Sequence, residues 1–517
     1  DAAERPLLVA ELLVRREHLR FSTGRGFLRL DPARRAVALS EHDPTSREHA
    51  YALAELAHAS LWHEAPDAHD VSRAALETAV AVGDPAALAY AYAAAAMSTV
   101  FRGESGGPEL AARGVAAATE ARDWWGFVHA ALWEANGTAS NVEPAYPQLL
   151  QKRRESLEEL GAPHPYVAWM SAAEAGAWLD VGHWEECTDR LRVALGSDPG
   201  AGPDVMTRLA ATRLAVLQGR QAEAESHLAR AEELFADTTD FLAFEFDAVR
   251  AMTRLTGGDP SGAVDAAWAG ATAAGVPPTR CEWLMPLAAR GLADLADGAR
   301  DRGEPLDDVL ARLDDLVARF PRVIRDGAFF DSPFYTRQLE GLDAVYAAEV
   351  ARCRRSPDEA ARWTAAADLL EGILPWDEAY AAFRAGESRL VRGQGTREEA
   401  AAILRRAHAV ASRLRAEPVL RETADLARAA RIPLGQVTPS GPATGVGAAG
   451  RPFGITPREA EILEHVVAGR TYGEIARALF LSEKTVSSHV SNLLRKTGTA
   501  NRVELARLAQ HHESPPP

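Results

Sequence analysis

Helix-breaking residues recur at a regular interval along most of this chain, and the interval leaves few folds open. Between the breaks the sequence is rich in Ala, Leu, Arg and Glu, which favour helices. The breaks fall about 39 residues apart, a helix-pair period, at 83–85, 122–124, 161–163, 200–203, 239–240 and 275–278. Secondary turns lie at 181–186, 218–223 and 257–260. Because one pair cannot bury its apolar face alone, we predict an all-α body in which the pairs stack into a superhelix.

The repeated pairs resemble divergent tetratricopeptide repeats, with units longer than the usual ~34 residues. We assign residues 1–432 to this TPR-like domain and predict further helices at 366–392 and 398–415. The resemblance implies a sensor or interaction domain, whose concave surface suits a peptide or a small effector. Packing in the repeat core is favoured over a ligand cage for six tryptophans: Trp124, Trp125, Trp133, Trp169, Trp178 and Trp184.

A stretch that cannot form a core follows the repeats. Residues 433–452, PLGQVTPSGPATGVGAAGRP, are rich in Gly, Pro and Ala and nearly uncharged. This composition predicts a flexible tether that spans roughly 25 Å root-mean-square. We therefore expect a separate C-terminal domain at 453–512, followed by a disordered tail at 513–517.

The C-terminal segment carries the local signals of four short helices. Thr456–Glu459 forms a capping box with proline at the first helical position, so a helix begins there. A second helix is predicted from about Tyr472, a third over Glu483–Lys496, and a fourth with Asn501 as its cap. Two short helices joined by so brief a turn suggest a helix-turn-helix.

The third predicted helix has two different faces. Its apolar stripe consists of Val486, Val490, Leu493 and Leu494. Its opposite face is small, polar and basic, and consists of Lys484, Ser488, Ser491, Asn492 and Arg495. Short hydroxyl and amide side chains let a helix approach base edges closely, and cations hold phosphates. An ordinary solvated helix face is the alternative interpretation when this helix is taken by itself.

The whole segment resembles the helix-turn-helix domain of the LuxR transcription factors, also called the GerE or FixJ/NarL type. The resemblance covers roughly 55–60 residues. Its matching positions are Thr456, Pro457, Arg458, Glu459, Ile462, Leu463, Gly469, Glu474, Ile475, Ala476, Leu479, Leu481, Ser482, Thr485, Val486, His489, Val490, Leu493, Lys496, Gly498 and Arg502. In that family the third helix enters the major groove of double-stranded DNA, and the fourth helix pairs two domains.

This resemblance implies site residues for DNA and for a homodimer. The implied DNA contacts are Lys484, Thr485, Ser487, Ser488, Ser491, Asn492, Arg495 and Lys496. The implied dimer contacts are Val503, Ala506, Arg507 and Gln510. Three positions depart from the family pattern, where Asn, Lys and Leu are usual: Tyr472, Ser487 and Thr497. The operator sequence therefore cannot be taken from a relative with Lys at position 487.

Repeats that end in this domain also resemble the C-terminal part of the large ATP-binding (MalT-like) regulators of the LuxR family. In those proteins a nucleotide-hydrolysing domain precedes the repeats, and the repeats receive an inducer or an inhibitory partner. The present chain lacks that domain and begins with Asp1 rather than Met. We therefore expect a truncated chain or a fragment of a longer regulator.

Charge is divided unevenly along the chain. Residues 451–517 hold nine Arg plus Lys and seven Glu, a net charge of +2. Because the whole chain has a net charge of −16, residues 1–450 together carry −18. An acidic body is repelled by DNA, so contact should be confined to the C-terminal domain and be sensitive to salt. Because +2 is low, we expect weak binding by one copy and tighter binding by a dimer on paired half-sites.

The remaining motifs exclude several other classes of protein. The phosphate-binding pattern GxxxxGK[ST] is absent, and His63 and His69 lie six residues apart, not the four of a zinc-protease helix. Cys187, Cys281 and Cys353 are widely spaced, which indicates buried reduced thiols and no disulfide framework. No apolar run reaches 18 residues. We expect a cytoplasmic protein without enzymatic activity, cofactor, metal or membrane association.

These observations together predict a sequence-specific DNA-binding transcriptional regulator whose helical repeats sense an effector or a protein partner. Two alternatives remain open. One is a protein-interaction scaffold with a vestigial DNA-binding module, which Tyr472, Ser487 and the low positive charge favour. The other is the output half of a signal-transducing ATPase, which a phosphate loop upstream in the full reading frame would establish.

Overall fold

The computed structural model of this protein is helical wherever it has regular structure. It describes residues 5–22, 28–139, 143–196, 200–234, 243–272, 283–323, 333–434, 457–467, 475–476, 479, 483–497, 499 and 505, and these ranges contain no strand. The chain divides into two compact units, Asp1–Val437 and Thr438–Pro517. Because the regular elements of the described residues are all helices, the all-α prediction is confirmed. None of the helices in these ranges has the length and apolar character needed to cross a membrane.

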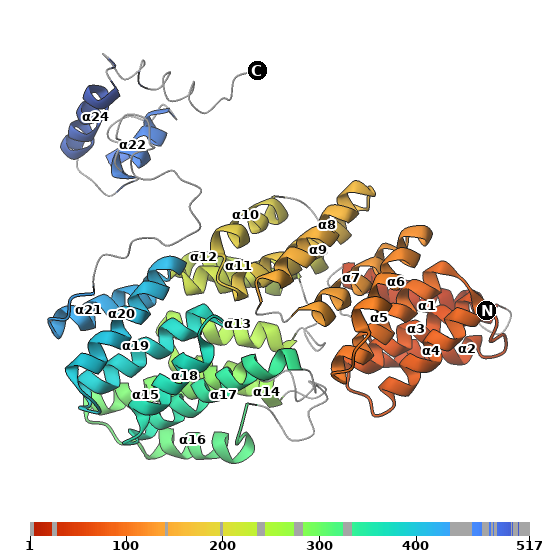
Figure 1. Ribbon diagram of the computed structural model, residues 1–517, viewed down its shortest axis with the longest axis horizontal. Helices are drawn as coiled ribbons and strands as arrows, with labels where there is room; N and C mark the ends of the chain where they lie inside the picture. Colours follow the sequence, from red (N-terminus) through yellow and green to blue (C-terminus); the bar gives the residue numbers. More distant parts are fainter. Residues whose placement is uncertain are drawn as a thin grey trace. The chain divides into compact units, whose positions relative to one another are not determined.

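The first unit consists of helices that pack in antiparallel pairs (Figure 1). Its helices are α1 (Pro6–Ser22), α2 (Leu30–Ser40), α3 (Arg47–Trp62), α4 (Ala68–Val82), α5 (Pro85–Phe101), α6 (Gly107–Ala121), α7 (Trp124–Thr138), α8 (Ala145–Glu159), α9 (His164–Asp180), α10 (Trp184–Leu195), α11 (Ala201–Leu217), α12 (Gln221–Leu234), α13 (Ala243–Thr256), α14 (Pro260–Thr272), α15 (Leu284–Arg302), α16 (Asp307–Arg319), α17 (Pro333–Arg354), α18 (Glu359–Leu370), α19 (Pro375–Val391), α20 (Arg397–Leu414) and α21 (Glu417–Ala429).

The predicted breaks coincide with helix boundaries wherever the structure describes them. At the first break Gly83 ends α4 with a left-handed φ of 75°, and Pro85 is the first residue of α5. Between them, the Asp84 carboxylate accepts a hydrogen bond from the Ala87 backbone N–H at 3.0 Å, which caps the new helix. The breaks at 122–124, 161–163 and 200–203 likewise lie at the starts of α7, α9 and α11. Those at 239–240 and 275–278 lie outside the described residues.

Successive pairs stack along one direction. The leading helices of neighbouring pairs contact each other in the order α5, α7, α9, α11, α13 and α15. Alanines fill much of the interface, which lets the backbones approach closely, and they belong to two large apolar clusters on either side of α9. Trp124 is half-buried, whereas Trp125, Trp133, Trp169, Trp178 and Trp184 are all buried in the core, as predicted for repeat packing.

The helix predicted over 366–392 is wrong as a single element. The structure ends α18 at Leu370 and begins α19 at Pro375. Gly372 between them has a left-handed φ of 68°, which a continuing helix cannot accommodate. Ile373 and Leu374 in the break are buried, so the apolar pattern runs on through it and hides the interruption.

The stack curls back on itself at its C-terminal end. Figure 1 places α20 and α21 beside the middle of the chain, near α11 and α12. Arg415 Nη2 donates to Glu185 Oε1 at 2.5 Å across 230 residues of sequence. A Cβ placed on Gly219 would lie 3.0 Å from Pro418 Cγ, so α21 closely covers the turn after α11. The repeats from α9 to α21 therefore form a closed turn of superhelix.

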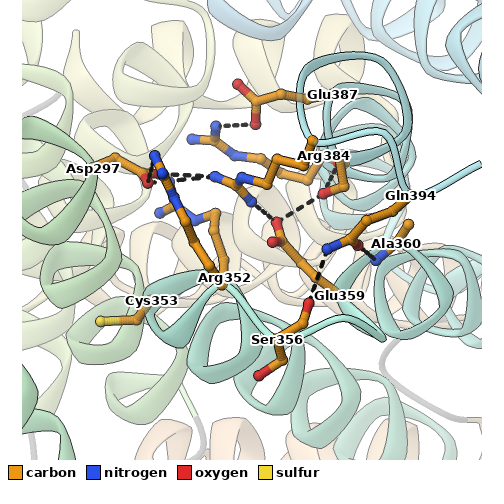
Figure 2. A network of polar contacts seen from close by, with 12 residues as sticks. Asp297, Arg352, Cys353, Ser356, Glu359, Ala360, Arg384, Glu387 and Gln394 are labelled. Atoms are coloured by element: carbon orange, nitrogen blue, oxygen red, sulfur yellow. Dashed lines mark hydrogen bonds and ion pairs between the residues drawn. The ribbon is translucent and has the colours of Figure 1, made fainter. Parts of the chain in front are cut away.

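A buried charge network joins α15, α17, α18 and α19 (Figure 2). Arg352, of which only 1% is exposed, donates from Nε to Glu349 Oε2 at 2.7 Å and from Nη2 to Asp294 Oδ1 at 2.6 Å. Arg392 extends the network to Asp297 and Glu359. Burial alone would lower the pKa of Arg352, but the facing carboxylates raise it above its ordinary value.

Candidate nucleic-acid interface

The C-terminal unit has an apolar core of its own. Its two longer helices are α22 (Pro457–Val467) and α24 (Glu483–Thr497), as predicted for the first and third helices. Residues 475–476 are helical within the predicted second helix, and Leu505 is helical within the predicted fourth. Side chains from all four segments meet in one cluster: Ile462, Val466, Ile475, Ala476, Val486, Val490, Leu493 and Leu505.

The apolar stripe predicted on α24 is confirmed as its inward face. Val486, Val490 and Leu493 are at most 1% exposed. Because an α-helix turns about 100° per residue, helix positions 484, 488, 491 and 495 lie on the side away from this stripe. The structure does not describe the side chains of six of the predicted DNA contacts: Lys484, Thr485, Ser488, Ser491, Asn492 and Arg495. Their contact with DNA stays a prediction.

The other two predicted DNA contacts are described. Ser487 is half-buried at the edge of the stripe. Lys496 Nζ donates to Glu459 Oε2 at 2.6 Å, and Glu459 is only 4% exposed. This ion pair joins the first turn of α22 to the last turn of α24 and thereby fixes the two helices against each other. The sequence pattern indicated Glu459 as a capping residue and gave no signal for this partner. A phosphate contact by Lys496 stays a prediction.

The end of α24 explains how the fold accepts Thr497 where the family usually has Leu. The Thr497 hydroxyl donates to the Leu493 carbonyl at 2.7 Å and lies 2.8 Å from the Thr499 hydroxyl. The Thr499 backbone N–H donates to the Leu494 carbonyl at 3.1 Å. Since its hydroxyl has local partners, the polar residue costs the core little.

The predicted dimer contacts cannot be placed. Val503, Ala506, Arg507 and Gln510 lie outside the described residues. Leu505, the described residue of that segment, is 1% exposed and belongs to the module core. Positions 503, 506, 507 and 510 therefore remain a prediction from the family resemblance.

The histidines and cysteines singled out in the sequence have structural surroundings. His63 Nε2 lies 3.0 Å from the Leu28 carbonyl, and His69 Nδ1 lies 2.6 Å from the Ser98 hydroxyl. Within the described residues no group of His, Cys, Asp and Glu is arranged to hold a metal ion. Cys187 and Cys353 are buried free thiols, and burial raises the pKa of Cys187 to about 12. Cys281 lies outside the described residues.

A second candidate site lies inside the repeat unit. A cavity of about 320 Å³ is lined by residues of α9, α11, α13, α15, α17, α19 and α21. Its polar wall includes Arg290, Trp376 and Asp377, which the sequence analysis did not single out. Trp376 stands directly after a helix-starting proline, and that is the one local signal that sets it apart from the core tryptophans.

The module's geometry defines the class of protein to which the chain belongs. Short helical segments around one small core, among them the longer helices α22 and α24, are the arrangement expected of a helix-turn-helix, a DNA-binding domain. Residues 454–509 match the family described as GerE, "Bacterial regulatory proteins, luxR family". The chain belongs to the luxR family of bacterial regulatory proteins.

Named relatives match the same C-terminal segment. The chain is 47% identical over 57 residues to the uncharacterized transcriptional regulatory protein YhcZ of Bacillus subtilis, which is 11% of this chain and 27% of that protein. It is 45% identical over 60 residues to the spore germination protein GerE of the same organism, 11% of this chain and 81% of GerE. It is 47% identical over 60 residues to the transcriptional regulatory protein UhpA of Escherichia coli, which is 12% of this chain and 31% of UhpA. The chain thus spans less than a third of YhcZ and UhpA.

Proposed function

We propose that this protein is a cytoplasmic, sequence-specific transcriptional regulator that binds double-stranded DNA through its C-terminal module. The observation that carries the proposal is the luxR-family match at 454–509 on a module with its own apolar core. GerE supports the independence of such a module, because the matched 60 residues make up 81% of that protein. We propose that the helical repeats sense an effector or a protein partner, for which their internal cavity offers room.

In this proposal α24 lies in the major groove and two copies of the module bind as a dimer. Its short polar positions 488 and 491 read base edges, and Arg495 contacts phosphate. The fourth helix supplies the dimer contact through positions 503, 506, 507 and 510. A helix through buried Leu505 would carry these positions roughly 100–160° away from it.

The direct test is selection of binding sites from a random DNA duplex library. The full chain and residues 450–517 alone are each selected at moderate salt, and the bound DNA is sequenced. We expect enrichment of one motif with two-fold symmetry. Tighter binding by the short fragment would mean that the repeats restrain the module.

Two variants that each introduce a negative charge locate the interface on α24. Ser488→Glu and Arg495→Glu should each lower affinity for the selected motif at least about tenfold, because they bring a negative charge to the DNA backbone. Ser105→Glu and Arg230→Glu make the same changes at exposed positions of the repeat unit and should leave affinity unchanged. Equal loss in both sets would assign the effect to net charge and remove α24 as the interface.

A protein-interaction scaffold is the second candidate, supported by the +2 balance of the module and by Tyr472 and Ser487. This candidate predicts no enriched motif from either protein in the selection. A motif obtained only when a longer reading frame is expressed would instead favour the output half of a signal-transducing ATPase.

A further inference from the structure

The cavity inside the repeat unit has the character of a small-molecule site. Its volume of about 320 Å³ lies at the lower end of the range of ligand pockets, about 300–1,000 Å³. Most of its wall is aliphatic, with Met206, Leu209, Val216, Met252, Leu287 and Val419 among the lining residues. Residues of α21 complete this wall, so the cavity takes its lining from both the middle and the end of the repeat unit.

One cation in the cavity wall has no hydrogen-bonding partner. The guanidinium of Arg290 lies over the Tyr380 ring at 4.5 Å and near the Trp376 ring at 5.7 Å, and these two rings are stacked. Within the part of the chain that the structure describes, its side chain makes no hydrogen bond or ion pair, and its Nε is buried. The other lining cation, Arg213, already pairs with Asp180 at 2.5 Å. Arg290 is thus the cation that an occupant of the cavity can engage.

The polar wall is held in place from behind. The Tyr380 hydroxyl donates to Glu349 Oε1 at 2.6 Å and accepts from Arg384 Nε at 3.1 Å. The Arg290 carbonyl accepts from Arg352 Nη2 at 3.2 Å. The Tyr380 side chain and the α15 backbone at Arg290 are therefore anchored to the buried charge network in Figure 2, which fixes this part of the wall before any ligand arrives.

We propose that this cavity binds a small organic acid whose carboxylate pairs with Arg290 and whose apolar body packs against Trp376 and the aliphatic wall. A planar guanidinium matches a carboxylate with two parallel hydrogen bonds. Asp377 also lines the cavity, and its burial favours the neutral carboxyl, which can donate a hydrogen bond to the same ligand. The proposal rests on the proposed sensor function, and it names the chemistry that the sensor recognises.

Three compounds with one apolar body and different polar ends test the head-group preference by calorimetry on the full chain. The compounds are 3-phenylpropionate, its primary amide and 3-phenylpropylamine. We expect saturable binding of the acid and at least about tenfold weaker binding of the amide and the amine, since a charge-assisted pair contributes more than a neutral one. Equal or tighter binding of the amide or amine would overturn the proposal.

Substitutions then assign the preference to Arg290. Arg290→Gln should weaken binding of the acid at least about tenfold and leave the amide within about threefold. Arg230→Gln, which changes an exposed surface arginine of α12, should leave both affinities unchanged. Trp376→Leu should weaken the acid and the amide alike, because it removes the apolar contact. Retention of acid binding by a folded Arg290→Gln protein would remove Arg290 as the partner.

The size of the apolar body is varied next, with indole-3-propionate and octanoate as further probes. Saturable binding of any of the three acids below about 10 mM supports the site, and absence of binding for all three overturns it. The DNA selection is independent of this result. A selected DNA motif without acid binding would overturn the site and keep the regulator, whereas acid binding without a selected motif would do the reverse.

Discussion

The guanidinium of Arg352 is almost completely shielded from solvent. The cost of burying its charge is therefore offset only by the groups that pair with it. Its donors face Glu349, Asp294 and Asp297 at 2.6–3.3 Å. Taking such charges out of water is costly, and an unpaired member left behind has no means to recover that cost. The network is therefore sensitive to the loss of any one member.

We predict that Arg352→Leu destabilises the repeat unit by about 3–5 kcal/mol, because it leaves Glu349 without its cation. Urea unfolding followed by tryptophan fluorescence measures this unit alone, since all 11 tryptophans lie at or before residue 376. Arg192→Leu removes an exposed ion pair with Asp189 and should change stability by less than about 0.5 kcal/mol. A similar small effect at both positions would contradict the importance of the network.

Asp377 gives the repeat unit a pH dependence of its own. Burial raises the pKa of its carboxyl to about 7, while Arg213 and Arg290 lower it and Asp180 raises it further. The unfolded carboxyl titrates at about 4, so between pH 4 and 7 the unfolded state loses its proton first and stability falls as pH rises.

Asp377→Asn should therefore stabilise the repeat unit by about 2 kcal/mol at pH 8 and leave it unchanged at pH 4. Thermal unfolding of both proteins across this pH range, followed by tryptophan fluorescence, measures the difference. A stabilisation of equal size at pH 4 would mean that the effect does not arise from the titration of this carboxyl.

At the scale of single helices, glycines decide how closely neighbours approach. Gly386 of α19 faces α20, where a Cβ would lie 2.5 Å from Leu404 Cδ2 and 2.6 Å from its Cγ. Gly176 of α9 is also helical, yet a Cβ there would meet no other atom within 4 Å. The same substitution should thus have opposite effects at the two positions.

Gly386→Ala should destabilise the repeat unit by about 1–3 kcal/mol because the added methyl overpacks the α19–α20 interface. Gly176→Ala should stabilise it by about 0.5–1 kcal/mol through better helix propensity in open space. Both changes can be measured by the fluorescence-detected urea unfolding. If both variants were stabilised, the contact between Gly386 and Leu404 would not limit the interface.

Elements with local signals were predictable, and those without were not. Asp84 and Pro85 specify a helix start by their own chemistry, and so do Thr396 and Glu399, which form a capping box at α20. The sequence pattern did not indicate the break between α18 and α19, because the buried residues in the break continue the apolar pattern. The five-residue polar face of α24 was predicted from its own residues, whereas the DNA contacts were implied by the family resemblance and remain untested.

Sites assembled from distant helices leave no pattern in the sequence. Arg290, Trp376 and Val419 come from α15, α19 and α21, and only the closed superhelix brings them to one cavity. The ion pair between Glu459 and Lys496 is a similar case, since capping and DNA contact each explained one partner separately. Periodicity identifies which residues face inward, but it cannot identify their partners across a turn of superhelix.

At the scale of the whole repeat unit, closure depends on a few tight contacts between its middle and its end. A Cβ on Gly182 would lie 3.0 Å from both Leu414 Cδ2 and Pro375 Cγ. Gly161 occupies a similar turn with a left-handed φ of 68°, but a Cβ there would meet nothing within 4 Å. Comparison of Gly161 with Gly182 therefore separates the effect of backbone strain from the effect of the contact that closes the superhelix.

Gly161→Ala should destabilise the repeat unit by about 1 kcal/mol through left-handed strain alone. Gly182→Ala should cost about 1–3 kcal/mol more, because its methyl also pushes against α19 and α20. The difference between the two, measured by urea unfolding, is the contribution of the closing contact. Equal destabilisation by the two substitutions would mean that the contact of Gly182 with α19 and α20 contributes nothing to the stability of the repeat unit.

The same closure has a consequence for the way the protein is made. Glu185 and Arg415 are 230 residues apart, so a ribosome needs roughly 10–50 seconds between the synthesis of one and the synthesis of the other. During this interval the turns after α9 and α11, which α20 and α21 will contact, are open to the cell. The nascent chain therefore depends on chaperones, or on rapid translation of its second half, to a degree that an open stack of repeats would not.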